Sequence, residues 1–121
     1  MNPENKKAFM LLKSVIFHYH GLDEAEQKIL QTTAEQLHAH TELAWANSFI
    51  AEDYLTAFDR ARSYLQKIIE STSRQTRLDY LKKVWEDNQK KGYISEMEAT
   101  AMLKLAADWQ VERELVEFVK R

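Results

Sequence analysis

The sequence predicts an all-α protein, a compact bundle of six to seven helices in a single domain over residues 1–121. The first observation is that the chain has only two glycines and one proline, whereas a β-sandwich or barrel needs a turn about every 8–12 residues. The second is that apolar residues recur at the i, i+3, i+4, i+7 spacing of a buried helix face. A chain of 121 residues, 45% hydrophobic and 30% charged, fits one folded domain.

The first half of the chain predicts three helices. Residues 7–19 are apolar almost all round, which is typical of a central helix covered on several sides. A second helix is expected over 23–39 and a short third one over about 42–50. Thr41 and Asp53 are the expected N-caps of the third and fourth helices, because their short side chains can accept a hydrogen bond from a free backbone N–H.

The second half predicts a long helix over 53–70, a connector at 71–76, helices over 76–88 and 95–108, and a short final helix in "VERELVEFVKR". Three of these helices show a clear apolar stripe that we expect to be buried, and in 76–88 it is Leu78, Leu81, Val84 and Trp85. In 53–70 the stripe is Tyr54, Leu55, Phe58, Ala61, Leu65, Ile68 and Ile69, and in 95–108 it is Met97, Ala101, Met102, Leu105 and Ala106. Trp45, Trp85 and Trp109 are expected in the core, with an aromatic-lined pocket between the hairpins as the alternative.

Two capping boxes belong to a repeated pattern. Asp23-x-x-Glu26 and Ser95-x-x-Glu98 each allow reciprocal side-chain to backbone hydrogen bonds at a helix start, worth about 1 kcal/mol. The surrounding segments, 11–30 and 80–103, share a helix, a glycine, an apolar residue, the capping box and a second helix. The matching pairs are Leu12 with Leu81, Val15 with Val84, Ile16 with Trp85, Leu22 with Ile94, Asp23 with Ser95 and Glu26 with Glu98. The repeat predicts two related helical hairpins around a long central helix.

The turns "HGLDEAE" (20–26) and "KGYISEME" (91–98) resemble those of the tellurite-resistance TerB-like family, which usually read D-G-x-I-x-x-x-E. The resemblance covers most of the chain. It implies an all-helical bundle of about seven helices and a role as a stress-related binding module that also occurs beside other domains. The family often has aspartate before the glycine, where this sequence has His20 and Lys91. A carboxylate that the acidic turn could contribute to a cation site is therefore absent from both turns.

The twelve residues from Asp87 to Glu98 also resemble a calcium-binding EF-hand loop. Such a loop supplies oxygen ligands from positions 1, 3, 5, 7, 9 and 12. Here those positions are Asp87, Gln89, Lys91, the Tyr93 carbonyl, Ser95 and Glu98. Lys91 places an ammonium where an oxygen is needed, so a glycine turn followed by a capped helix start is the favoured interpretation. Calcium binding is the alternative.

Histidines supply a second candidate metal site. His18 and His20, and likewise His38 and His40, form H-x-H pairs whose members point in opposed directions on a helix. His18 is explained by a position at a helix C-terminus, where a cation is favoured. Glu35-x-x-His38 followed by Glu42 matches only half of a di-iron motif. A divalent metal bound at the turn between the first two helices is the alternative, and the candidate metal ligands are His20, Asp23, Glu24, Glu26, Asp87, Ser95 and Glu98.

Charge is unevenly distributed although the formal net charge is only −2. Residues 21–53 carry seven acids and one base, and residues 60–91 carry nine bases and four acids. The near-neutral total argues against a nucleic-acid partner. We expect solvated helix faces of opposite bias that attract each other in the fold. The functional alternative is a basic patch for an anionic partner, formed by Arg60, Arg62, Lys67, Arg74 and Arg77.

The remaining motifs predict that the chain is not an enzyme. There is no cysteine, which excludes disulfides and thiol chemistry, and no G-x-S-x-G, P-loop or H-E-x-x-H motif is present. Lys13 and Ser14 interrupt the N-terminal apolar run, and no stretch approaches the roughly 20 apolar residues of a membrane span, so a cytoplasmic protein is expected. The leading prediction is a non-catalytic interaction module with a protein partner, and a weak homodimer is an alternative. A metal- or anion-responsive binding protein comes second, and a small metalloenzyme third.

Overall fold

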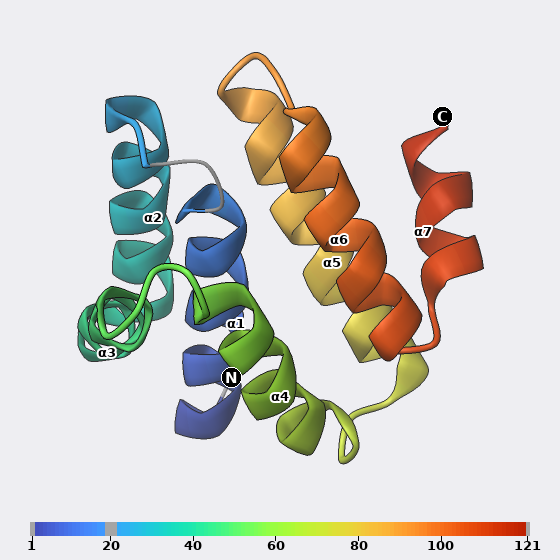
Figure 1. Ribbon diagram of the computed structural model, residues 1–121, viewed down its shortest axis with the longest axis horizontal. Helices are drawn as coiled ribbons and strands as arrows, with labels where there is room; N and C mark the ends of the chain where they lie inside the picture. Colours follow the sequence, from blue (N-terminus) through green and yellow to red (C-terminus); the bar gives the residue numbers. More distant parts are fainter. Residues whose placement is uncertain (1, 19–21, 121) are drawn as a thin grey trace.

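The computed structural model describes residues 2–18 and 22–120, which form seven α-helices (Figure 1). This confirms the all-α bundle of six to seven helices. The helices are α1 (Pro3–His18), α2 (Glu24–Leu37), α3 (His40–Ala51), α4 (Ala57–Ile69), α5 (Arg74–Lys90), α6 (Glu96–Asp108) and α7 (Glu112–Val119). Among the described helices, none combines the length and the apolar content needed to cross a membrane.

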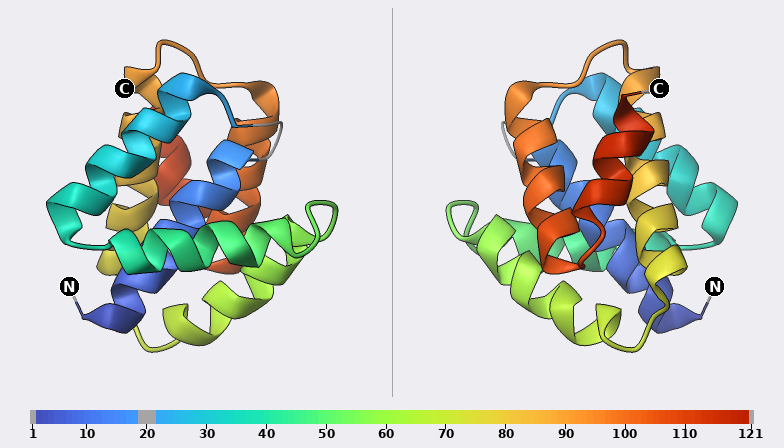
Figure 2. Two further views of the ribbon diagram at one scale, coloured as in Figure 1. Left: turned by 90° about the vertical axis from the view of Figure 1, so that its left-hand side faces the viewer. Right: turned by 90° about the vertical axis from the view of Figure 1, so that its right-hand side faces the viewer.

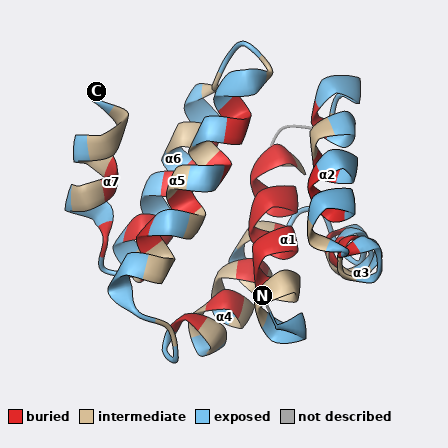
Figure 3. Cartoon of the chain, turned by 180° about the vertical axis from the view of Figure 1, so that it is seen from behind, coloured by how far each residue is buried: buried red, intermediate tan, exposed pale blue. Residues whose placement is uncertain are grey.

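Helix α1 is the central helix, as its all-round apolar pattern predicts. The ten consecutive residues 8–17 are buried, and α1 contacts α2, α3, α4 and α6. Figure 2 shows α3 lying across one side of α1, and Figure 3 shows the buried stretch running along α1. Two buried residues of α1, Lys13 and Ser14, are polar. A charged side chain at the centre of a helical core needs a buried partner.

The two hairpins predicted from the repeat are present. Helices α5 and α6 run side by side, with α7 packed against both (Figures 1 and 2), and α2 packs on α1 and α3. Both capping boxes are formed as expected, at Asp23 and at Ser95. The connector between α4 and α5 is short, and Ser73 caps α5 by accepting a hydrogen bond from the Thr76 N–H.

The predicted start of the fourth helix is wrong. Helix α4 begins at Ala57 rather than at Asp53, so Tyr54 and Leu55 lie in the turn before it and their side chains are 65% and 97% exposed. They therefore do not belong to the buried stripe. Met97 also leaves its predicted stripe and is 48% exposed. It lies in the first turn of α6, where the capping glutamate Glu98 is the residue that turns inward.

The predicted N-caps at the two ends of α3, Thr41 before it and Asp53 after it, are also wrong. Thr41 lies inside α3, and the N-cap is Ala39, which makes no side-chain cap. The preceding residue, His38, adopts a left-handed conformation with φ of 53°, and the Ala39 N–H donates to the Ala34 carbonyl at 2.8 Å. The link from α2 to α3 is thus closed by backbone bonds. The Asp53 side chain accepts a hydrogen bond from the Leu55 N–H at 3.0 Å, and this bond forms a separate turn before α4.

The tryptophans divide between core and edge. Trp109 is fully buried, as expected, whereas Trp45 and Trp85 are partly buried and pack against the core. Trp45 lies near Phe49 and Tyr64, with ring centroids 5.6 Å and 5.1 Å away. These aromatic residues join α3 to α4 and so stabilise the layer that covers α1.

Candidate functional site

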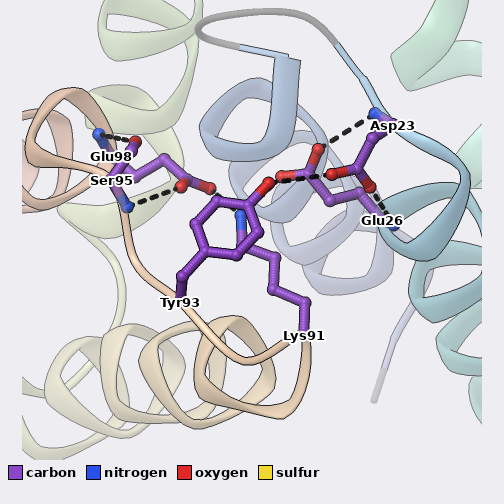
Figure 4. Close-up of polar contacts among 6 residues, drawn as sticks. All are labelled: Asp23, Glu26, Lys91, Tyr93, Ser95 and Glu98. Carbon is purple, nitrogen blue, oxygen red and sulfur yellow. Dashed lines mark hydrogen bonds and ion pairs between the residues drawn. The ribbon is translucent and has the colours of Figure 1, made fainter.

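A single buried ammonium joins the two hairpins. The Lys91 Nζ lies 2.6 Å from Glu26 Oε2, at the start of α2, and 2.5 Å from Glu98 Oε2, at the start of α6. All three side chains are fully buried. Figure 4 shows Lys91 reaching up between the two glutamates. We call these three residues the Lys91 junction.

The capping boxes position both glutamates of the junction. Glu26 Oε1 accepts from the Asp23 N–H and Glu98 Oε1 accepts from the Ser95 N–H, each at 3.0 Å (Figure 4). Each carboxylate therefore uses one oxygen for its own helix start and presents the other to Lys91. Glu26 and Glu98 are thus matching residues of the two repeated segments, and the cation between them, Lys91, comes from the second segment.

The α5–α6 loop carries Lys91 back toward the first hairpin. Gly92 has φ of +95°, a conformation that side chains disfavour, and it turns the chain immediately after Lys91. Tyr93 extends the connection, because its hydroxyl donates to Asp23 Oδ2 at 2.8 Å. The Lys91 ammonium also lies 4.7 Å from the Tyr93 ring centroid and 5.2 Å from that of Phe17. The loop is therefore fixed on α1 and α2.

The pKa values of the two carboxyls in the Lys91 junction shift in opposite directions. Burial raises the pKa of Glu26, and the Lys91 and Asp23 hydrogen bonds only partly offset this. Burial acts on Glu98 in the same direction, but the bonds from Lys91 and Ser95 outweigh it and leave the Glu98 pKa lowered. Burial alone would lower the pKa of Lys91, and the two carboxylates raise it above its usual value.

The predicted metal ligands are only partly brought together. Four of them converge at the junction, namely Asp23, Glu26, Ser95 and Glu98, whereas Glu24 is exposed and Asp87 lies apart in α5. His20 lies outside the described residues. Within residues 2–18 and 22–120, no three His, Asp or Glu side chains are grouped as a metal site. Since Lys91 occupies the inner oxygens of both glutamates, a metal at this turn would have to displace its ammonium.

The EF-hand-like segment takes the form of a capped helix start. Residues 87–90 remain helical within α5, so Asp87 is not a loop residue. Its carboxylate instead bonds the buried ammonium of Lys13, which also donates to Thr33 Oγ1. Sequence reasoning missed Lys13 as a structural partner. The available signal was a lysine inside a helix that is otherwise apolar on all sides.

Most of the predicted basic patch is engaged within the fold. Arg62 makes a bidentate ion pair with Asp108, with N···O distances of 2.8 and 2.9 Å. Arg74 lies 2.7 Å from Glu114, and Arg77 donates to the carbonyls of Ile69 and Trp109 at 3.2 and 3.3 Å. Arg60 bonds the turn before α4, and Lys67 is exposed on α4. The arginines thus join helices to one another.

An exposed apolar surface lies at the α3–α4 turn. We call Tyr54, Leu55, Phe58 and Met97 the Leu55 surface. These residues border a hollow of about 350 Å³ whose inner wall includes Val15 and Ile50. Sequence reasoning placed Tyr54, Leu55 and Met97 in the core and so missed this surface, whereas Phe58 is half-buried and packs against the core as expected.

The turn that carries the Leu55 surface is held by several hydrogen bonds. Arg60 donates to the carbonyls of Phe49 and Asp53 at 2.9 and 2.8 Å and to Thr56 Oγ1 at 2.9 Å. Its guanidinium also lies 4.8 Å from the Phe49 ring centroid. Together with the Asp53 turn, these contacts fix the backbone while Leu55 points into solvent. The exposure of Leu55 therefore belongs to a defined conformation.

Comparison with known proteins adds no family to this description. The chain matches no family model, and neither a curated protein nor a solved structure matches it significantly. The resemblance to TerB-like proteins therefore rests on the two turn motifs alone.

Proposed function

We propose that this protein is a non-catalytic interaction module that docks a partner protein on the Leu55 surface. The observation that carries the proposal is Leu55 itself, which is 97% exposed on a turn held by Arg60 and Asp53. Exposing a leucine costs about 1.5–3 kcal/mol of burial energy. A fixed, exposed apolar group beside a hollow is typical of a docking site.

The charges around the Leu55 surface favour a basic partner. Glu52 and Asp59 have side chains 78% and 83% exposed, and their carboxylates lie 3.5 Å from Arg60 and 3.7 Å from Arg62. Asp53 and Glu96 are exposed next to Tyr54 and Met97. Lys104 is the cation that lines the hollow. A segment that presents a large apolar residue flanked by Lys or Arg would therefore be complementary in shape and charge.

Two further observations support the non-catalytic part of the proposal. The sequence lacks the catalytic motifs for nucleophilic, phosphate and zinc-dependent chemistry, and the buried charges of the Lys91 junction are paired with one another. The TerB-like resemblance supports a role in stress response. Under this proposal, the module serves that response by recruiting its partner.

Peptide selection tests the docking site and does not require the partner to be identified first. A displayed library of helical peptides would be selected on the wild-type protein and then screened against Leu55→Asp. Leu103→Asp is the matched control, because Leu103 is a partly exposed leucine on α6 outside the Leu55 surface. We expect selected peptides to carry an apolar anchor with flanking Lys or Arg, and to lose at least tenfold in affinity for Leu55→Asp but not for the control.

Two results would count against this proposal. Peptides that bind Leu55→Asp as tightly as wild type would remove the Leu55 surface from the site. Self-association that disappears in Leu55→Asp, measured by sedimentation across protein concentrations, would show that the surface is covered by a second copy of the chain. Circular dichroism of each variant would confirm that the fold is retained.

A further inference from the structure

A second concave site lies between α2 and α5, away from the Leu55 surface. Its cavity has a volume of about 310 Å³, at the lower end of the roughly 300–1,000 Å³ typical of small-molecule sites. One wall is a face of α2 that includes Ala25, Ile29 and Thr32. The opposite wall is the last turn of α5. We call this cavity the α2–α5 groove.

The floor of the groove is a rigid, buried polar network. Lys13 donates to both Asp87 and Thr33, and Thr33 in turn donates to the Ile29 carbonyl at 2.9 Å. Asp87 and Thr33 are 3% and 7% exposed and line the groove. Since these groups already satisfy one another, the floor is preorganised and a ligand need not reorganise it.

Positive charge is concentrated around this floor. The Asp87 carboxylate is shared by Lys13, by Lys90 at 3.2 Å and by Lys83 at 3.6 Å, so three ammonium groups converge on one carboxylate. Lys28 lines the opposite wall of the groove, and both Lys28 and Lys90 are exposed. Lys91 also lines the groove, but its charge is taken up by Glu26 and Glu98. Lys28 and Lys90 are thus placed to hold an anion between the walls.

We propose that the α2–α5 groove binds a small organic anion, with a carboxylate or phosphate head group between Lys28 and Lys90. The hydroxyl of Thr32 and the amide of Gln36 offer hydrogen bonds along the α2 wall, and the apolar body of the ligand packs against Ala25 and Ile29. A few polar groups that fix the head and apolar walls that hold the body are the usual composition of such a site. This site is independent of partner docking at the Leu55 surface.

Titrations followed by amide NMR test the groove. The probes are benzoate and phenyl phosphate, which share a ring and differ in head group, and inorganic phosphate and chloride at matched ionic strength. We expect the organic probes to shift the amides of Thr32, Thr33 and Lys90 with saturation at millimolar concentration or below. Whichever organic probe binds more tightly identifies the preferred head group.

Matched variants separate a specific site from general charge attraction. Lys28→Gln/Lys90→Gln should weaken binding of the better probe by about tenfold or more, whereas Lys67→Gln/Lys120→Gln, which removes the same charge from exposed lysines elsewhere, should stay within twofold. Lys28→Gln alone leaves the Asp87 ion pairs intact and should still weaken binding severalfold. Leu55→Asp should bind as wild type does.

Three results would overturn the assignment. One is the absence of saturable shifts in the groove with either organic probe. Another is equal weakening by the two double variants, which would indicate general attraction to a positive surface. The third is that inorganic phosphate reproduces the shifts of the organic probes at the same affinity, which would leave no role for the apolar walls.

Discussion

Lys13, in the middle of α1, and Asp87, in the last turn of α5, form a buried ion pair across 74 residues of sequence, with side chains 0% and 4% exposed. The pair connects the central helix to the second hairpin. Attraction between two such charges is offset by the cost of removing both from water, so the net contribution of the pair to stability is small. Loss of one partner alone is costly, because the remaining charge is then buried without compensation.

Asp87→Asn should therefore lower the free energy of unfolding by about 3–5 kcal/mol, as measured by urea denaturation. Glu86→Gln is the matched control, since it removes a carboxylate that is not buried from the neighbouring position of α5. The double variant Lys13→Met/Asp87→Leu should lose much less than Asp87→Asn. Equal stability of Asp87→Asn and Glu86→Gln would show that the pair does not hold the helices together.

Acid should weaken the same contact. Burial alone would raise the pKa of Asp87, but its hydrogen bond and ion pair with Lys13 outweigh burial and lower it. A carboxyl with a lowered folded-state pKa contributes stability that is full above the ordinary aspartate pKa of about 3.9 and is lost as pH falls through the folded-state pKa. The stability of wild type should thus fall below pH about 4, with a smaller decrease in the Lys13→Met/Asp87→Leu variant. An equal loss of stability below pH about 4 in wild type and in Lys13→Met/Asp87→Leu would show that Asp87 is not the group responsible.

Replacing Lys91 should have the opposite pH signature. Lys91→Met leaves Glu26 and Glu98 buried and facing one position without a cation, so neutral-pH stability should fall by about 3–5 kcal/mol. The pKa of at least one glutamate must then rise, and a raised carboxyl pKa gives stability that is present at low pH and lost as pH rises. Denaturation at pH 7 and pH 5 should show partial recovery at pH 5. Glu26→Gln added to Lys91→Met should restore part of the loss at pH 7.

Divalent metals test the role of Lys91 as the resident cation of the turn. Millimolar Ca²⁺, Mn²⁺ or Zn²⁺ should leave the melting temperature of wild type nearly unchanged, since Lys91 occupies the glutamate oxygens. In Lys91→Ala the same oxygens become available, and the melting temperature should rise with metal concentration. A clear metal-dependent rise in wild type would favour the metal-binding alternative.

Arg60→Met tests whether the Leu55 turn is held in place. The substitution removes the bonds to the carbonyls of Phe49 and Asp53 while keeping an unbranched side chain over Phe49. We expect faster hydrogen exchange at the Leu55 amide and at its neighbours, with little change in the amides of α6. Unchanged exchange at Leu55 would mean that the Asp53 turn is sufficient.

The order and type of the helices could be predicted because their signals are local. A buried face is encoded in residues three and four apart, and each capping box joins residues three apart, as at Asp23–Glu26 and Ser95–Glu98. The Tyr54–Leu55 turn shows the limit of this reasoning. Its residues fit the apolar spacing of α4, but the Asp53 turn and the Arg60 bonds to α3 end that pattern before Ala57.

The sequence by itself determined the helical bundle, the two related hairpins and the form of the turn "KGYISEME". Only the tertiary structure decided where the charges of that turn are directed. Glu26 and Glu98 both bond Lys91, and Asp87 bonds Lys13, because packing of the second hairpin against the first brings together groups that lie far apart along the chain. A buried charge requires a partner, and sequence spacing does not encode which distant side chain supplies it.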